Sequence, residues 1–343
     1  MAALPSIDVS CVRGTDIAAK RRAAADLDRA ARELGFLVVT GHGVSDALFG
    51  EAMDLARAFF ALPEAAKRRC ARPSREESRG YAAMGGEALG KSLGAQAAFD
   101  LKETFAIGPI DTYPAAALGE HAYPHYTPNV WPEALPRLRV VWEAYYREMR
   151  RVADELLRLL AIALDQAEDL LVAKTGHCYS NLRAQHYPAL AEAPRPGQLR
   201  AGAHTDYGAV TVLRGDSGAD GLQIETAPGQ WRDVSFPDDA YVVNLGDQLA
   251  MWSNDRWRST LHRVVVPPGA GSRARLSLGF FHMPDAAATI ECLPNCAGPD
   301  RPARYPPISA GWHKRLKFAM ANGLDDVIAM APESARRAAA AAR

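Results

Sequence analysis

The sequence predicts an α+β protein in which a mostly helical first half precedes a second half built from short strands. A long helix is expected to begin near Pro136, because apolar residues recur there at steps of three and four as far as Ala163. From Asn181 onward, β-type runs follow one another about every ten residues, with turn-forming Gly, Pro and Asn-Asp pairs between them. Many short strands without intervening helices favour a β-sandwich or a double-sheet jelly roll.

Composition argues against several classes of protein. The 343 residues carry 40 Lys and Arg against 40 Asp and Glu, so the formal net charge is zero and no nucleic-acid partner is expected. No uncharged apolar run approaches the roughly 18 residues of a membrane span. The five cysteines form no disulfide pattern, and the first residues do not resemble a secretory signal. We therefore expect a cytoplasmic protein without a membrane partner, either a monomer or a weak homodimer.

The first half of the chain is expected to form two helices around a short strand. Thr15 is a candidate N-cap for a helix that ends near residue 34, and Ser45 is a candidate N-cap for a second helix. Residues 35–40 between these helices have the composition of a strand. Residues 79–94 are rich in Gly and Ala, which suits either a loop that covers a cleft or a solvated linker.

The second half supplies the strands of the predicted core. The β-type runs are residues 182–187, 209–213, 221–224, 231–234, 241–244, 262–266, 276–281 and 289–292. We expect a mostly helical N-terminal region packing on the core over residues 1–175, the jelly-roll core over 176–295, and a C-terminal helical segment over 296–343. Residues 331–343 have little apolar surface to bury, so a frayed tail is expected there.

Three residues of the second half are candidate metal ligands. His204 and Asp206 are two residues apart on an extended segment, so their side chains point to the same face. His262 begins another β-type run, and a double-sheet barrel can bring such distant strand ends together. Two imidazoles and one carboxylate are the ligand set of non-haem Fe(II) oxygenases. Zinc accepts the same ligands in hydrolases, so the ligand types alone do not select the metal.

A cation and a hydroxyl follow the third candidate ligand. Arg275 and Ser277 share one face of a predicted strand, and a guanidinium beside a hydroxyl suits the carboxylate of an organic acid. The same spacing occurs at Arg72 and Ser74, but in what reads as a polar surface turn. The later pair therefore predicts a site for an organic acid.

Six motifs of the second half occur in the order found in one enzyme family. They are Asn181-Leu-Arg-Ala-Gln-His-Tyr-Pro188, His204-Thr-Asp-Tyr-Gly208, Asp220-Gly-Leu-Gln223, Val243-Asn-Leu-Gly-Asp247, Ser259-Thr-Leu-His-Arg-Val264 and Arg275-Leu-Ser-Leu-Gly-Phe-Phe281. Together they strongly resemble the isopenicillin N synthase-like branch of the Fe(II)/2-oxoglutarate-dependent oxygenases. The resemblance extends to about Met320 and implies a distorted double-stranded β-helix, or jelly roll, as the core.

The resemblance also implies the ligands of the active site. His204, Asp206 and His262 would bind Fe(II), with 2-oxoglutarate and O2 at the remaining coordination positions. Arg275 and Ser277 would hold the distal carboxylate of 2-oxoglutarate. The charges of iron, Asp206, 2-oxoglutarate and Arg275 sum to zero, which lowers the cost of burying them together.

The strand before the metal motif adds further candidates. Tyr187 matches the family's tyrosine that helps to hold the distal carboxylate. Gln185, a longer amide, stands where many plant members carry the asparagine that contacts the cosubstrate carboxylate at the metal. Strand alternation places Arg183 on the face of Tyr187 and Gln185, whereas His186 points away. Arg183 is then available for a substrate carboxylate, for a further contact to 2-oxoglutarate or for a structural ion pair.

The predicted substrate pocket is less well defined than the metal site. Tyr81, Tyr207 and Phe281 are expected by position to line it. The predicted activity is oxidation, mainly hydroxylation, of a small molecule such as an amino acid, a small peptide or a secondary metabolite, with succinate and CO2 as co-products. Four alternatives remain open: a 2-oxoglutarate-independent Fe(II) oxidase like isopenicillin N synthase, an enzyme forming ethylene or succinate from 2-oxoglutarate itself, a zinc hydrolase and a non-catalytic binding protein.

Overall fold

The core is built on an eight-stranded sheet. The computed structural model describes residues 4–93, 98–190, 192, 194–216, 220–267 and 273–341. The strand order is β1-β2-β10-β7-β12-β5-β4-β3, with β1 and β2 parallel and the other neighbours antiparallel. The strands are β1 (Ser6–Asp8), β2 (Phe36–Thr40), β3 (Gly80–Ala82), β4 (Glu103–Ile107), β5 (Asn181–Tyr187), β7 (Val210–Gly215), β10 (Tyr241–Leu245) and β12 (Arg275–His282).

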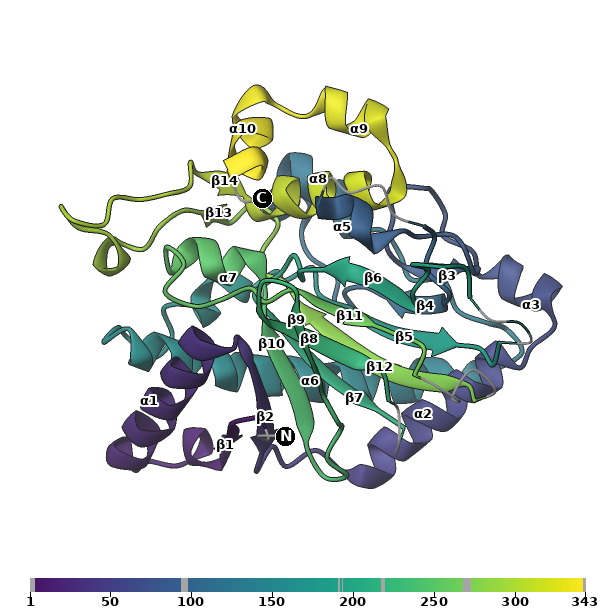
Figure 1. The fold of residues 1–343 in the computed structure, drawn as a ribbon, viewed down its shortest axis with the longest axis horizontal. Helices are drawn as coiled ribbons and strands as arrows, with labels where there is room; N and C mark the ends of the chain where they lie inside the picture. Colours follow the sequence, from purple (N-terminus) through teal and green to yellow (C-terminus); the bar gives the residue numbers. More distant parts are fainter. Residues whose placement is uncertain are drawn as a thin grey trace.

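A four-stranded sheet packs against one face of the large sheet. Its order is β6-β11-β8-β9, and its strands are β6 (Ala201–His204), β8 (Leu222–Ala227), β9 (Gln230–Asp233) and β11 (His262–Val264). Buried side chains from both sheets fill the space between them, including Tyr187, Leu213, Ile224 and Val264. The two sheets form the jelly roll of Figure 1, which confirms the predicted fold class.

Helices lie against the opposite face of the large sheet. α6 (Pro136–Ala163) runs along that sheet, and α1 (Ile17–Glu33) and α2 (Asp46–Phe60) pack against α6 (Figure 1). The predicted apolar stripe of α6 is buried, with Trp142 and Leu160 both fully inaccessible to solvent. α6 is therefore the long supporting helix that the sequence predicts.

The remaining elements are short. The helices are α3 (Glu64–Arg69), α4 (Ala115–Leu118), α5 (Ala122–His125), α7 (Asp247–Trp252) and α9 (Asp325–Met330). The 3-10 helices are η1 (Ser10–Arg13), η2 (Leu89–Leu93), η3 (Gly119–His121), η4 (Val172–Thr175) and η5 (Pro294–Cys296). A two-stranded ribbon pairs β13 (Thr289–Ile290) with β14 (Ile308–Ser309).

The C-terminal segment differs from the prediction. α8 (Ala310–Asn322) packs against η2, and α10 (Glu333–Ala341) packs against α8 and β14. The expected frayed tail is wrong for the described part of this segment, because Ala335, Ala338 and Ala339 on α10 are buried. Small alanine side chains let α10 approach α8 closely, so this helix needs little apolar surface to dock.

The predicted order of helix, strand and helix near the N-terminus is confirmed by α1, β2 and α2. Ser45 caps α2, since its hydroxyl accepts a hydrogen bond from the backbone N–H of Leu48 at 3.4 Å. The first helix is capped by Asp16 and not by Thr15, because the Asp16 carboxylate accepts from the N–H of Ala19 at 3.0 Å. β1 to β4 all belong to the large sheet, so this sheet crosses the region boundary expected near residue 175.

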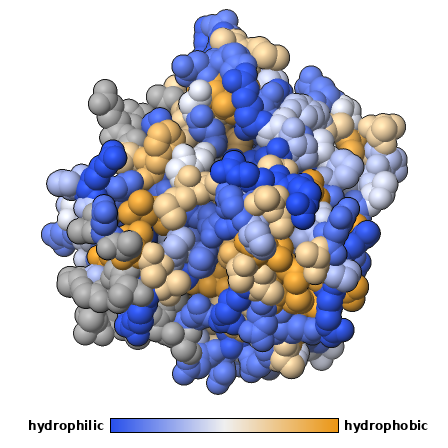
Figure 2. Space-filling model, turned by 90° about the vertical axis from the view of Figure 1, so that its right-hand side faces the viewer, coloured by the Kyte–Doolittle hydropathy of each residue, from blue (hydrophilic) through white to orange (hydrophobic). Residues whose placement is uncertain are grey.

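One face of the molecule shows hydrophobic groups in separate patches (Figure 2). Figure 2 views the molecule from the side on which α3 lies in Figure 1, and hydrophilic residues interrupt the hydrophobic ones across that face.

Within the described part of the chain, no helix is both long and apolar enough to cross a membrane.

Candidate active site

Three buried side chains meet between the two sheets. β6 and β11 pair with His262 opposite His204, and Asp206 follows directly after β6. The Nε2 atoms of His204 and His262 lie 3.9 and 3.8 Å from the Oδ1 atom of Asp206. One ligand atom from each residue lies within 4.8 Å of the others. We call these residues the metal triad; their donor set fits Fe(II), as the sequence predicts.

Backbone carbonyls orient both imidazole rings. Nδ1 of His204 lies 2.7 Å from the carbonyl oxygen of Gly202, and Nδ1 of His262 lies 3.0 Å from that of Thr260. When each Nδ1–H donates to its carbonyl, the free lone pair of each ring is on Nε2, the atom that lies near Asp206. Burial, reinforced by the neighbouring His262, lowers the pKa of His204 to about 3. The His204 ring is therefore neutral near pH 7, which is the form that binds a metal.

The second oxygen of Asp206 is fixed by hydrogen bonds. Oδ2 accepts from the Thr211 hydroxyl at 2.6 Å and from the Asn244 amide at 2.7 Å, which leaves Oδ1 on the side of the two imidazoles. Burial alone would raise the pKa of Asp206, but the imidazoles of His262 and His204 and these hydrogen bonds outweigh it and lower that pKa. Asp206 is thus held as a carboxylate with one oxygen available to a metal.

A cavity next to the metal triad contains the predicted organic-acid site. β5 and β12 pair so that Arg275 lies opposite Tyr187 and Ser277 lies opposite Gln185. Nη1 of Arg275 donates to the Ser277 hydroxyl at 3.2 Å, and the Tyr187 hydroxyl donates to Oε1 of Gln185 at 3.1 Å. These four residues and the metal triad line one cavity, which we call the Arg275 cavity.

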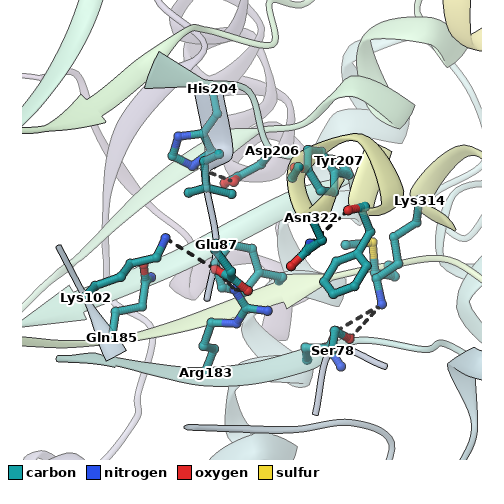
Figure 3. A pocket seen from close by; sticks show the side chains of 16 residues that line it. Ser78, Glu87, Lys102, Arg183, Gln185, His204, Asp206, Tyr207, Lys314 and Asn322 are labelled. Atoms are coloured by element: carbon teal, nitrogen blue, oxygen red, sulfur yellow. Dashed lines mark hydrogen bonds and ion pairs between the residues drawn. The ribbon is translucent and has the colours of Figure 1, made fainter. Parts of the chain in front are cut away.

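A second cavity adjoins the first at the metal triad. It shares His204, Asp206, Gln185 and Phe281 with the Arg275 cavity. Its other lining residues come mainly from the segment before β4, from β5 and from α8: Ser78, Glu87, Leu89, Lys102, Asn181, Arg183, Tyr207, Met283, Lys314, Phe318, Ala321 and Asn322. We call it the Lys314 cavity. In Figure 3, His204 and Asp206 lie at one end of it and Lys314 and Ser78 lie away from them.

Arg183 lines the Lys314 cavity but already has an acidic partner. Its Nη1 lies 3.3 Å from Oε2 of Glu87, and its guanidinium lies 5.9 Å from the centre of the Phe281 ring. Glu87 also pairs with Arg72, and with Lys102 at 3.5 Å. Burial raises the pKa of Glu87, yet these three cations hold it far below its usual range. Of the three roles considered for Arg183, the structural ion pair is the one seen here.

Two of the three predicted pocket-wall residues lie in the Lys314 cavity. Tyr207 and Phe281 both line it. Tyr81 does not: its ring packs against Phe59, and its hydroxyl donates to Oε2 of Glu103 at 2.6 Å. The prediction for Tyr81 is therefore wrong, because its side chain contacts Phe59 of α2 and Glu64 of α3 and lines neither cavity.

His186 points away from both cavities, as strand alternation predicts. Its Nδ1 lies 2.8 Å from Oε1 of Glu103, and its ring stacks on Phe60.

Sequence reasoning missed several charged residues of the Lys314 cavity. Lys102 pairs with Asp100 at 3.1 Å, and their spacing of two on an extended segment was an available signal. Glu87 and Lys314 carried no such signal. Glu87 lies just before the short helix η2, and Lys314 lies on the buried face of α8, where a charged residue is not expected.

Two sequence models of known families match the chain. One is described as the N-terminal region of non-haem dioxygenases in morphine synthesis and matches residues 4–134. The other is described as the 2OG-Fe(II) oxygenase superfamily and matches residues 178–284. The second match contains His204, Asp206, His262 and Arg275.

Individual relatives agree with these matches. The chain is 34% identical over 317 residues to the 2-oxoglutarate-Fe(II) type oxidoreductase hxnY of Emericella nidulans, covering 89% of this chain and 86% of that protein. It is 30% identical over 289 residues to the proline hydroxylase buaE of Petromyces alliaceus, covering 81% and 86%. The crystal structure of a full-length Neurospora crassa protein in complex with alpha-KG and thymine is similar at a TM-score of 0.79 and 29% identity, covering 93% of this chain and 97% of that one. The chain therefore belongs to the 2OG-Fe(II) oxygenase superfamily, as a dioxygenase with Fe(II) as its metal cofactor and 2-oxoglutarate as its cosubstrate.

Proposed function

We propose that this dioxygenase hydroxylates a small organic molecule bound in the Lys314 cavity while 2-oxoglutarate occupies the Arg275 cavity. The observation that carries the proposal is that the two cavities adjoin at the metal triad. The substrate and 2-oxoglutarate could therefore bind in separate cavities and still lie next to the same metal ion. The proline hydroxylase relative and the thymine complex of the Neurospora crassa protein support a small-molecule substrate.

The residues of the triad would hold Fe(II) through Nε2 of His204, Nε2 of His262 and Oδ1 of Asp206. When bound, iron and 2-oxoglutarate supply the oxidising chemistry, in which a C–H bond, O2 and 2-oxoglutarate become C–OH, succinate and CO2. The chain contributes positioning, since Thr211 and Asn244 keep Asp206 in one orientation. It also limits access of water, because the whole triad is buried.

Arg275, Ser277 and Tyr187 would bind the distal carboxylate of 2-oxoglutarate. Arg275 is 3% exposed and lies with its guanidinium 4.8 Å from the centre of the Tyr187 ring. A guanidinium beside a hydroxyl is suited to a carboxylate, and its burial strengthens the attraction. Gln185 lines the same cavity and accepts from Tyr187 through Oε1, so its amide N–H would be the group that donates to a ligand.

The test measures how many succinate molecules form per molecule of product. We would incubate Fe(II)-loaded protein with 2-oxoglutarate, O2 and a panel of small organic molecules, and measure succinate together with the mass of each product. The proposal predicts one succinate per product molecule, with each product heavier by one oxygen atom. Turnover without succinate would indicate an oxidase, ethylene would indicate breakdown of 2-oxoglutarate itself, and turnover without O2 would indicate a hydrolase; each of these results would contradict the proposal.

A further inference from the structure

Lys314 is a buried lysine without an acidic partner. It lies on α8, is 6% exposed and lines the Lys314 cavity. Among the described residues, no carboxylate lies within ion-pair distance of its Nζ atom, whereas the cavity's other cations, Arg183 and Lys102, each pair with Glu87. Keeping a buried lysine charged without a carboxylate is costly, so an anion from outside the chain would stabilise its charged form.

The neighbours of Lys314 present further hydrogen-bond donors. Nζ of Lys314 donates to the Ser78 hydroxyl at 3.0 Å and to Oδ1 of Asn181 at 3.3 Å, and Ser78 also donates to this Oδ1 at 2.9 Å. With Oδ1 engaged in this way, the amide orientation of Asn181 is fixed. Nδ2 of Asn181 is buried and has no hydrogen-bond partner among the described residues. The amino group of Lys314 and an unpaired amide N–H therefore occur together at one part of the cavity wall.

The charged groups in and around the wall of this cavity carry an excess of positive charge. Arg72, Arg183 and Lys102 surround Glu87, and Lys102 also pairs with Asp100. These three cations and two carboxylates leave one positive charge before Lys314 is counted. The bound metal and 2-oxoglutarate do not offset it, since with Asp206 and Arg275 their charges already sum to zero.

We propose that Lys314, with the Asn181 amide, binds the carboxylate of the substrate and so selects small carboxylic acids. The inference rests on the proposed function, because it assigns the substrate class of that same cavity. The acid group would be held away from the metal, at the end of the cavity where Lys314 and Ser78 lie in Figure 3. The rest of the molecule would extend toward the metal triad between apolar groups that include Phe281, Met283 and Phe318.

The residues that line the Lys314 cavity also argue against a free amino group on the substrate. The carboxylates that line the Lys314 cavity are Glu87, which three cations already surround, and Asp206, which belongs to the metal triad. An ammonium group would therefore find no acidic partner among the described lining residues. Of the predicted substrate classes, the cavity favours a carboxylic acid with an apolar body over a zwitterionic amino acid.

Binding of an acid should be linked to uptake of a proton. Burial, together with the nearby Arg79, Arg183 and Arg72, lowers the pKa of Lys314 well below its ordinary value. A carboxylate placed against Nζ favours the charged form and would raise that pKa again. The lysine would then gain a proton as the acid binds, which a neutral ligand would not cause.

The test compares three ligands that share one body: 3-phenylpropionate, 3-phenylpropanamide and phenylalanine. Titration calorimetry would be run anaerobically on the full chain loaded with Fe(II) and saturating 2-oxoglutarate, in two buffers of different ionisation enthalpy so that proton uptake is measured. We expect the acid to bind about 10- to 100-fold more tightly than the amide and the amino acid, with net proton uptake, because hydrogen bonds to charged groups contribute about 1.5–3 kcal/mol.

Three variants test whether Lys314 causes the preference for the acid and the proton uptake. Lys314→Met should remove both the preference for the acid and the proton uptake, and it leaves no carboxylate unpaired. Asn181→Asp should have the same effect by supplying an internal carboxylate to Lys314. Arg315→Gln removes a charge from the same helix, where Arg315 pairs with Glu76 outside the cavity, and should retain the acid preference.

The outcomes separate this inference from the proposed function. A protein that binds 2-oxoglutarate at its iron but binds the three ligands equally, binds none of them, or keeps the acid preference in Lys314→Met would overturn the carboxylate site alone. A protein that fails to bind 2-oxoglutarate at its iron would overturn the proposed function first.

Discussion

Arg275 and Tyr187 lie directly opposite each other on the paired strands β12 and β5, with the guanidinium 4.8 Å from the centre of the tyrosine ring. This register also places Ser277 opposite Gln185, so one face of the strand pair carries all four polar groups of the Arg275 cavity. A shift of register by one residue would turn these groups to the opposite face. Strand pairing therefore determines where 2-oxoglutarate can bind.

Replacing Arg275 should weaken binding of 2-oxoglutarate. We predict that Arg275→Gln raises the Kd for 2-oxoglutarate by at least about 30-fold, since truncating one partner of a buried charge pair costs about 2–5 kcal/mol. Affinity for Fe(II) should change little, because the triad is untouched. Arg263→Gln is the matched control, as Arg263 stacks on Trp231 outside both cavities. Equal 2-oxoglutarate affinity in the two variants would contradict the assignment.

Removing a hydrogen-bond donor to the Asp206 carboxylate should weaken metal binding. Asn244→Leu deletes the amide that donates to Oδ2 of Asp206 at 2.7 Å. We expect the affinity for Fe(II) to fall about 10- to 100-fold, the usual effect of losing a group that orients a ligand. Thr211→Val should act in the same direction, because it removes the other donor to Oδ2. Anaerobic metal titration measures the effect, and unchanged affinity in both variants would argue against this role.

Tyr81 should matter for stability and not for catalysis. Its hydroxyl donates to Glu103 at 2.6 Å within the packing of β3 and β4. We predict that Tyr81→Phe lowers the free energy of unfolding by about 1–3 kcal/mol, because a hydrogen bond to a buried carboxylate is lost. kcat/KM per folded molecule should stay within about twofold of the wild type, a change below about 0.4 kcal/mol. A large fall in kcat/KM with unchanged stability would contradict this prediction and indicate that Tyr81 contacts the substrate.

Glu103 should make stability depend on pH in the acid range. Burial alone would raise its pKa, but hydrogen bonds from His186, Lys67 and Tyr81 outweigh this and lower the pKa from 4.5 to about 2. Because the folded-state pKa is the lower one, the contribution of Glu103 is complete above pH 4.5 and is lost as the pH falls toward 2. In urea unfolding, the stability difference between the wild type and Glu103→Gln should shrink across that window. A constant difference would contradict the prediction.

Much of the fold and of the metal site could be predicted because the signals are local. The stripe of α6, the cap at Ser45 and the spacing of His204 and Asp206 each follow from helical or strand geometry within a few residues. β6 was missed because Ala201–His204 contains no β-branched or aromatic residue, and pairing with β11 decides its conformation.

The substrate cavity could be predicted only in part because its residues come from separate segments. Arg183 was placed correctly on its strand face, but Glu87, which binds it, lies 96 residues earlier in the chain. Lys314 contacts Asn181 only after α8 docks on the core. The direction of Tyr81 depends on β3 joining the edge of the large sheet through β4, which its own sequence does not indicate.

Anaerobic titration of the protein with Fe(II) and 2-oxoglutarate tests the central claim most directly. If the metal triad and the Arg275 cavity bind the two together, a weak visible charge-transfer band should appear and saturate at one 2-oxoglutarate per iron. The band should require much higher 2-oxoglutarate in Arg275→Gln and should be absent in His262→Ala. A wild-type protein that contains Fe(II) by metal analysis but shows no band at saturating 2-oxoglutarate would contradict the account.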